Sequence, residues 1–138
     1  MVAGRVLVAG EGRGPLLRLT HPISLWGGVD PVSGTIVDPR HPQHGVSITD
    51  TVLALPSAVG SSSSSAIMLE LLREGTAPAA ILMGQADAIL ALGGIVGREL
   101  GYEPIPVVQV EMHRLDDLPD GTLVDVGRDG RIAAAAVG

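Results

Sequence analysis

The middle of the chain alternates between short β-type runs and stretches whose apolar residues recur at helical spacing. This alternation constrains the fold more than any other feature, because strand–helix–strand units form parallel strands joined by right-handed crossovers. The pattern predicts strand, helix, strand, helix and strand over Thr51 to Leu55, Ser61 to Glu74, Ala79 to Met83, Asp87 to Leu100 and Ile105 to Val110. We therefore expect an α/β fold.

Shorter β-type runs flank this unit on both sides. Two of them, Arg5 to Val8 and Leu16 to Leu19, are separated by a glycine-rich segment that favours a hairpin between them. Near the other end, turn sequences border runs at Thr122 to Val126 and Arg131 to Ala135. The sequence thus predicts a β-rich half beside the strand–helix half, within a single domain over residues 1–138.

A long stretch from Gly27 to Ser47 has too many prolines and glycines for a regular helix. Its segment Asp30-Pro-Val-Ser-Gly34 has the composition of a tight turn. A stretch of this length inside a small domain is uncommon unless it is functional or disordered.

Composition excludes several classes of function. The net charge is −6, and the nine arginines are scattered along a chain without lysine, so we expect no nucleic-acid partner. The absence of cysteine excludes a disulfide and a thiolate ligand for an iron–sulfur cluster from this chain. No apolar run is long enough for a membrane span, and the first residues do not resemble a secretory signal, so we expect no membrane partner and a cytoplasmic location.

The most distinctive local feature is Gly60 followed by five serines, Ser61 to Ser65, between a predicted strand and a predicted helix. Serine caps helix amino termini, where free backbone N–H groups and the helix dipole favour an anion. The run therefore predicts a site for a carboxylate or phosphate, with a flexible linker or a simple cap as an equally weighted alternative.

Two histidines, His41 and His44, lie three residues apart and follow Asp38 at the same spacing. Such spacing permits metal ligation on a helix, but a proline-rich loop does not fix the geometry. We expect no metal site built by this chain alone. These residues are more simply explained as holding a loop in place or meeting a partner surface.

Several segments together resemble the aconitase X swivel domain, over about Arg5 to Val126. They are Trp26-Gly-Gly-Val-Asp-Pro31, Ile36-Val-Asp-Pro-Arg-His-Pro42 with His44-Gly45, Leu55-Pro-Ser57 with Gly60-Ser61-Ser62, Gly75-Thr-Ala-Pro-Ala-Ala80 and Ile89-Leu-Ala-Leu-Gly93.

The resemblance implies a swivelling β/β/α domain like the last, mobile domain of aconitase. Such a domain docks on, or is fused to, a large catalytic aconitase X subunit that carries iron or an iron–sulfur cluster; none is expected on this chain alone. The resemblance also implies a heterodimeric hydro-lyase acting on a small hydroxy acid, with this chain inactive by itself.

Characterised members of that family are cis-3-hydroxy-L-proline dehydratase and phosphomevalonate dehydratase of the archaeal mevalonate pathway. In both, a serine of the small part is the base, and Ser61 occupies that motif position here. The run continues as Ser62 to Ser65, whereas the common archaeal form has other residues after that serine. This difference favours hydroxyproline as the substrate.

The substrate-binding candidates are Gly60, Ser62 and Ser63 in the serine run, with Asp30, His41 and His44 from the other motif segments. Two further interpretations stay open. The chain could be a non-catalytic lid over a partner's site, or a stand-alone anion-binding protein.

Overall fold

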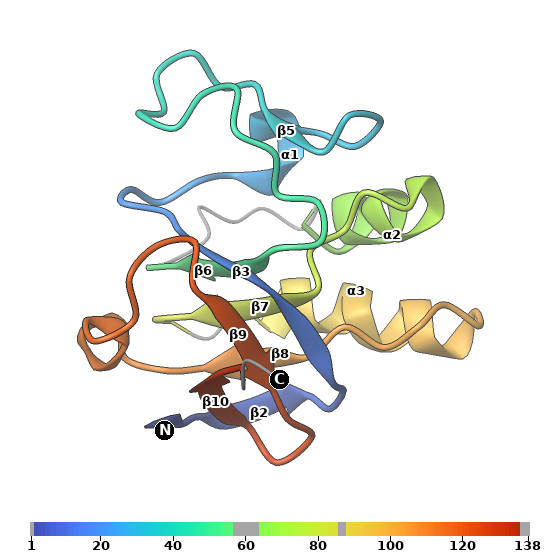
Figure 1. The fold of residues 1–138 in the computed structure, drawn as a ribbon. Helices are drawn as coiled ribbons and strands as arrows, with labels where there is room; N and C mark the ends of the chain where they lie inside the picture. The colour runs from blue at the N-terminus through green and yellow to red at the C-terminus, as the bar shows by residue number, and fades with distance from the viewer. Residues whose placement is uncertain (1, 57–63, 86–87, 136–138) are drawn as a thin grey trace.

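A computed structural model describes residues 2–56, 64–85 and 88–135, and its main feature is an eight-stranded sheet (Figure 1). The strand order is β1-β10-β9-β3-β6-β7-β8-β2. The strands are β1 (Val2–Ala3), β2 (Arg5–Val8), β3 (Gly12–Arg18), β6 (Val52–Leu55), β7 (Ala80–Met83), β8 (Val107–Gln109), β9 (Leu123–Val126) and β10 (Arg131–Ala134).

The predicted strand–helix–strand–helix–strand unit is confirmed. Strands β6, β7 and β8 are parallel to one another, and β3 is parallel to β6 on its other side. The crossovers contain α2 (Ser64–Glu74) and α3 (Ala88–Glu99), which pack side by side on one face of the sheet. Within this unit, the helices and strands begin and end no more than three residues from the predicted bounds.

The predicted hairpin between the first two long strands is wrong. Strand β2 pairs antiparallel with β8, whereas β3 pairs with β6 and β9. The glycine-rich segment is not a turn, because Gly12 and Gly14 belong to β3. A Cβ on Gly12 would lie 2.2 Å from the Ala79 carbonyl oxygen, and one on Gly14 would lie 2.2 Å from the Asp50 carbonyl oxygen. These glycines let β3 pass close to the neighbouring backbone.

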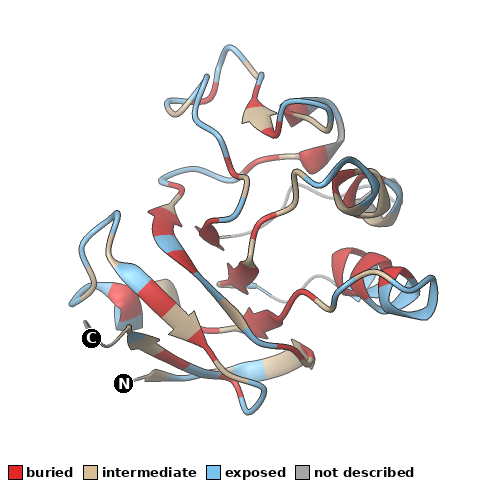
Figure 2. Cartoon of the chain, turned by 45° about the vertical axis from the view of Figure 1, so that its right-hand side comes forward, coloured by how far each residue is buried: buried red, intermediate tan, exposed pale blue. Residues whose placement is uncertain are grey.

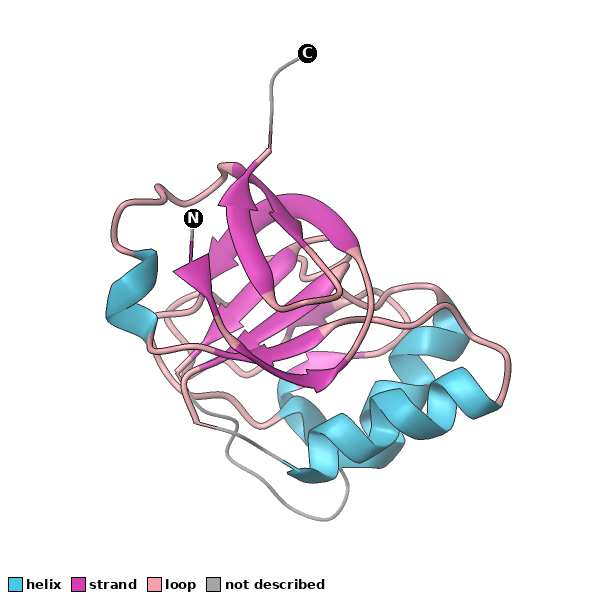
Figure 3. Ribbon diagram, turned by 90° about the horizontal axis from the view of Figure 1, so that it is seen from below, coloured by secondary structure: helices cyan, strands magenta, loops and turns pink. Residues whose placement is uncertain are grey.

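The sheet curls round on itself, as the view from below in Figure 3 shows. Strands β1 and β2 stand at opposite ends of the strand order, yet only Gly4 separates them in the chain. The Gly4 N–H donates to the Gly130 carbonyl oxygen at 3.0 Å, which joins this crossing point to the β9–β10 hairpin. The curled sheet encloses a cluster of aliphatic side chains that includes Leu16, Val108 and Ile132.

Both faces of the central strands are buried (Figure 2). In β6, Val52 and Ala54 face the enclosed cluster, while Leu53 and Leu55 face the helices. Parallel strands covered on both sides read as continuous apolar runs, which explains the sequence of this region. The core is aliphatic, as expected from a chain with 1% aromatic residues.

The irregular stretch after β3 covers the part of the helix-side face that α2 and α3 leave open. It contains α1 (Leu25–Gly28) and a small hairpin of β4 (Val29–Asp30) and β5 (Thr35–Ile36). Its side chains Ile36 and Ile48 are fully buried in the same cluster as Leu53. We call residues 20–50 the excursion; it is a third element of the helix layer, above α2 in Figure 1.

The turn predicted from Asp30 to Gly34 is confirmed as the connection between β4 and β5. Gly34 has a φ of 72°, a conformation that L side chains rarely adopt. A Cβ at this position would also lie 2.2 Å from Thr49 Oγ1, and that hydroxyl is held by the Thr76 carbonyl oxygen at 3.1 Å. No described helix is long and apolar enough to cross a membrane.

Replacing Gly34 with alanine should destabilise the protein by about 2–4 kcal/mol, through left-handed strain and the clash with Thr49. Gly45→Ala is the matched control, because Gly45 also has a positive φ, 88°, but a Cβ there would meet nothing within 4 Å. Chemical denaturation of both variants measures the difference. Equal losses of stability would contradict the close contact at Gly34.

Candidate functional site

The carboxyl ends of the parallel strands form one edge of the sheet, and chain segments after β6 and β7 are tied together there. The Gly84 N–H donates to the Leu55 carbonyl oxygen at 3.0 Å, and the Gln85 N–H donates to the Pro56 carbonyl oxygen at 3.1 Å. In parallel α/β sheets, ligands bind at this edge. Gly60, Ser61, Ser62 and Ser63 follow β6 in the chain, but they lie outside the described residues.

His41 belongs to the excursion and is buried, with 6% of its surface exposed. Its Nδ1 accepts the Gln43 backbone N–H at 3.0 Å, so the ring proton is on Nε2, which faces the His21 carbonyl oxygen at 3.2 Å. Both ring nitrogens are therefore engaged by the backbone. In this arrangement the imidazole fixes the loop, which is one of the roles expected from the sequence.

His44 differs from His41 in that its side chain is exposed. Its backbone N–H donates to the His41 carbonyl oxygen at 3.1 Å, within the same turn. Among residues 2–56, 64–85 and 88–135, no three histidine, aspartate or glutamate side chains gather as metal ligands would.

Asp38 also stabilises this loop. Its Oδ1 accepts the Arg40 backbone N–H at 3.0 Å, and the Arg40 guanidinium lies 3.5 Å away. The hydrogen bond from the Arg40 backbone, followed by the charge of Arg40, lowers the pKa of the Asp38 carboxyl below its ordinary value. The carboxylate therefore stays ionised and keeps the turn before His41 in place.

Gln43 fastens the loop to the end of β3. Its side-chain oxygen accepts the Thr20 N–H at 3.0 Å, and its amide nitrogen donates to the Arg18 carbonyl oxygen at 3.1 Å. A shallow depression of about 300 Å³ lies here, lined by Arg18, Leu19, Thr20, Gln43 and Asp120. Nothing in the sequence pattern marks Gln43, because a glutamine in a proline-rich loop is usually solvated.

The Arg18 side chain extends from the same strand end. It donates to Asp116 Oδ1 and to the Met112 carbonyl oxygen, each at 2.8 Å, while its backbone N–H donates to Asp120 Oδ1 at 2.7 Å. These contacts join β3 to the segment that follows β8, which includes the 3-10 helix η1 (Met112–Leu115). The edge is thereby held together from the excursion across to η1.

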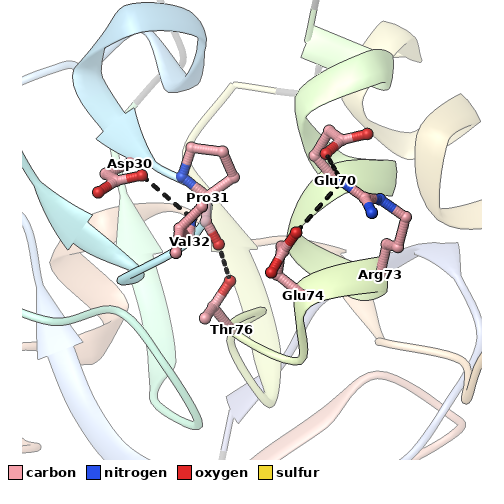
Figure 4. A network of polar contacts seen from close by, with 7 residues as sticks. All are labelled: Asp30, Pro31, Val32, Glu70, Arg73, Glu74 and Thr76. Carbon is pink, nitrogen blue, oxygen red and sulfur yellow. Dashed lines mark hydrogen bonds and ion pairs between the residues drawn. The ribbon is translucent and has the colours of Figure 1, made fainter.

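Asp30 is the last residue of β4, in the small hairpin of the excursion (Figure 4). Its carboxylate accepts the Val32 N–H and the Ser33 hydroxyl, each at 3.0 Å, and so closes the β4–β5 turn. Thr76, which precedes β7, donates its hydroxyl to the Pro31 carbonyl oxygen at 2.5 Å.

These contacts place Asp30 and His41 at opposite edges of the sheet. Residues before a parallel strand and residues after one lie at opposite edges of the sheet. Thr76 precedes β7 and anchors the Asp30 turn, whereas Arg18 and His21 come at and after the end of β3 and anchor the loop of His41. The substrate-binding roles of Asp30, His41 and His44 stay predictions.

Residues 1–134 match the sequence profile of the aconitase X swivel domain. The chain belongs to the aconitase X swivel domain family. The expected swivel-domain fold is confirmed by the crystal structure of Thermococcus kodakaraensis aconitase X in its holo form. That chain superposes with a TM-score of 0.84 and 30% identity, and the match covers 97% of each chain.

Two curated relatives of the swivel domain carry different names. A cis-3-hydroxy-L-proline dehydratase of Pseudomonas aeruginosa is 42% identical over 118 residues, which are 86% of this chain and 20% of that protein. A phosphomevalonate dehydratase small subunit of Methanosarcina acetivorans is 36% identical over 131 residues, which are 94% of this chain and 87% of that protein. The chain thus spans about a fifth of the first relative.

Two of the motif segments that resemble the swivel domain meet in the structure. Thr76 of the segment Gly75 to Ala80 donates to Pro31 of the segment Trp26 to Pro31. At the other edge of the sheet, Gln43 joins the segment that contains His41 to the Arg18 carbonyl oxygen at the end of β3. In this swivel domain, Thr76 and Gln43 thus hold the excursion, one at each edge of the sheet.

Replacing Gln43 with leucine should free the Thr20 N–H while leaving the sheet intact. Loss of that hydrogen bond should speed hydrogen exchange of the Thr20 amide roughly tenfold, the effect of about 1.4 kcal/mol. The Leu19 amide, which donates to the Ala54 carbonyl oxygen at 2.8 Å, is the internal control. Unchanged protection of Thr20 would contradict the anchoring role of Gln43.

Proposed function

We propose that this chain is the small part of a two-part aconitase X-type dehydratase, which eliminates water from a hydroxy acid. The observation that carries the proposal is the family match over residues 1–134, since relatives from both named groups are dehydratases. These dehydratases are named for two different substrates but share the swivel domain. The reaction type, elimination of water, is therefore the property that this chain most simply shares with them.

A large partner supplies the rest of the enzyme in this proposal. The Pseudomonas relative is a much longer protein, of which this chain matches 20%. The Methanosarcina relative is named a small subunit and is matched over 87% of its length. The first observation favours a larger catalytic part beside the swivel domain, and the second favours a separate large subunit. Together they favour a heterodimer in which this chain is inactive alone.

The iron or iron–sulfur cluster expected from the resemblance does not fit this chain. The sequence has no cysteine, and the described residues gather no set of three metal-binding side chains. We therefore assign the metal or cluster to the large partner, with no cofactor bound by this chain alone.

Ser61 is the proposed base, with Gly60, Ser62 and Ser63 beside it. A serine oxygen removes a proton from carbon only in its ionised form, and the amino terminus of a helix such as α2 stabilises an anion. The oxygen would take the proton from the carbon next to the substrate carboxylate. Backbone N–H groups of Ser62 and Ser63 would hold that carboxylate.

Cis-3-hydroxy-L-proline is the proposed substrate. Removal of the proton from the carbon beside the carboxylate and departure of the neighbouring hydroxyl as water leave an enamine, which tautomerises to a pyrroline carboxylate. The 42% identity to the Pseudomonas enzyme and the continuing serine run support this choice. Phosphomevalonate is the second candidate, because a small subunit with that name is matched over 94% of this chain.

Ser61→Ala should abolish turnover in a complex reconstituted with a large aconitase X subunit from the same genome, and should leave assembly intact. Ser65→Ala, four residues further along the same run, is the matched control and should keep most of the activity. The assay follows pyrroline carboxylate formation, with phosphomevalonate tested in parallel. Near-normal turnover of Ser61→Ala would remove Ser61 from the role of base.

The same variants separate the remaining interpretations. A non-catalytic lid predicts that Ser61→Ala changes affinity for the partner while turnover stays measurable. A stand-alone anion-binding protein predicts that the isolated chain binds carboxylates or phosphate in calorimetry, which the two-part enzyme does not require.

A further inference from the structure

The outward face of α3 is apolar, which is unusual for a helix at a protein surface. Ile89, Leu92, Ile95 and Val96 are 36% to 52% exposed, and we call these four side chains the α3 face. Leu100, just past the helix, is 65% exposed. No charged residue occurs from Ala88 to Gly97.

The opposite side of α3 explains why all its large side chains except the buried Leu90 point outward. Gly93 and Gly97 are buried against α2, where a Cβ on Gly93 would lie 2.8 Å from the Ser65 carbonyl oxygen. A Cβ on Gly97 would lie 2.5 Å from Leu72 Cδ1. Because only glycine permits this close packing, the sequence places its bulky apolar residues on the outer side of the helix.

Helix α2 offers an internal comparison, since it packs beside α3 on the same layer. Its outer face carries Arg73, which pairs with Glu70 at 2.6 Å and with Glu74 at 3.1 Å (Figure 4). The hydrogen bond from Arg73, together with its charge, lowers the pKa of the Glu70 carboxyl. The outer face of α2 thus carries charged side chains, as is typical of a surface in contact with water, whereas the α3 face is apolar.

The α3 face begins at the carboxyl edge of the sheet. The helix starts at Ala88, five residues after β7 ends at Met83, and its two charged residues, Arg98 and Glu99, lie in the last turn at the far end. If Ser61 acts on a substrate held by a partner, that partner must cover this edge. The apolar surface is thus continuous with the interface that the proposed function requires.

We infer that the α3 face is a docking surface for the large subunit of the proposed dehydratase; the inference rests on that proposed function. Four side chains are a small part of the roughly 800 Å² per partner that a stable dimer buries, so the face suits an extension of another interface better than a dimer contact of its own. In the Pseudomonas relative, the matching domain is 20% of a single chain, which leaves ample protein to cover it.

Leu92→Arg should weaken binding of the large subunit roughly tenfold or more, because a charge would enter a desolvated apolar contact. Leu123→Arg is the matched control: Leu123 is 45% exposed, against 52% for Leu92, and lies on β9 in the other half of the sheet. Calorimetry with a large aconitase X subunit from the same genome measures affinity, and circular dichroism verifies folding. Val96→Glu is a second variant on the same face.

Weakened binding by Leu92→Arg and Val96→Glu, with Leu123→Arg like the wild type, supports the inference. Wild-type affinity of both α3 variants overturns it and leaves the proposed function standing. Concentration-dependent dimers of the isolated chain that Leu92→Arg abolishes would assign the face to a second copy and overturn it too. Failure of the wild-type chain to bind the large subunit overturns both proposals.

Discussion

Burial of both faces of the central parallel strands is the constraint on which this architecture depends. Leu53 and Leu55 need cover on one side of β6, and Val52 and Ala54 need it on the other. The curled end of the sheet encloses the second set. The helix side is too wide for α2 and α3 alone, so the excursion completes the layer with Ile36 and Ile48. A proline-rich stretch thereby becomes part of the core.

The anchors of the excursion follow from this arrangement. At one edge of the sheet, Thr76 holds the turn that contains Asp30, and at the other, Gln43 holds the loop that contains His41. Hydrogen bonds hold the excursion at both edges of the sheet, and no buried side-chain nitrogen or oxygen of the described residues lacks a hydrogen-bond partner. At the edge that carries the end of β6, Gln43 fastens the excursion to the end of β3, and Arg18 fastens the segment after β8 to the same strand end.

Periodicity predicted the parallel unit because strands buried on both faces and amphipathic helices leave different spacings in a sequence. It did not predict the partner of β2, since a curled sheet pairs segments that are far apart in the chain. Nor did it reveal the roles of Gln43 and Thr76, which depend on tertiary contacts alone. Nor does periodicity show why a glycine, which ordinarily weakens a helix, occurs at Gly93, where it permits close packing of α3 on α2. For Ser61, sequence resemblance remains the basis of the assignment.

The central claim is that this chain completes an enzyme that is inactive without it. A titration of the large aconitase X subunit with increasing amounts of this chain, followed by the rate of water elimination from cis-3-hydroxy-L-proline, tests the claim most directly. We expect no turnover from either part alone, and a rate that rises with added chain until it saturates. Full activity of the large subunit alone, or a mixture inactive on both hydroxyproline and phosphomevalonate, would contradict the claim.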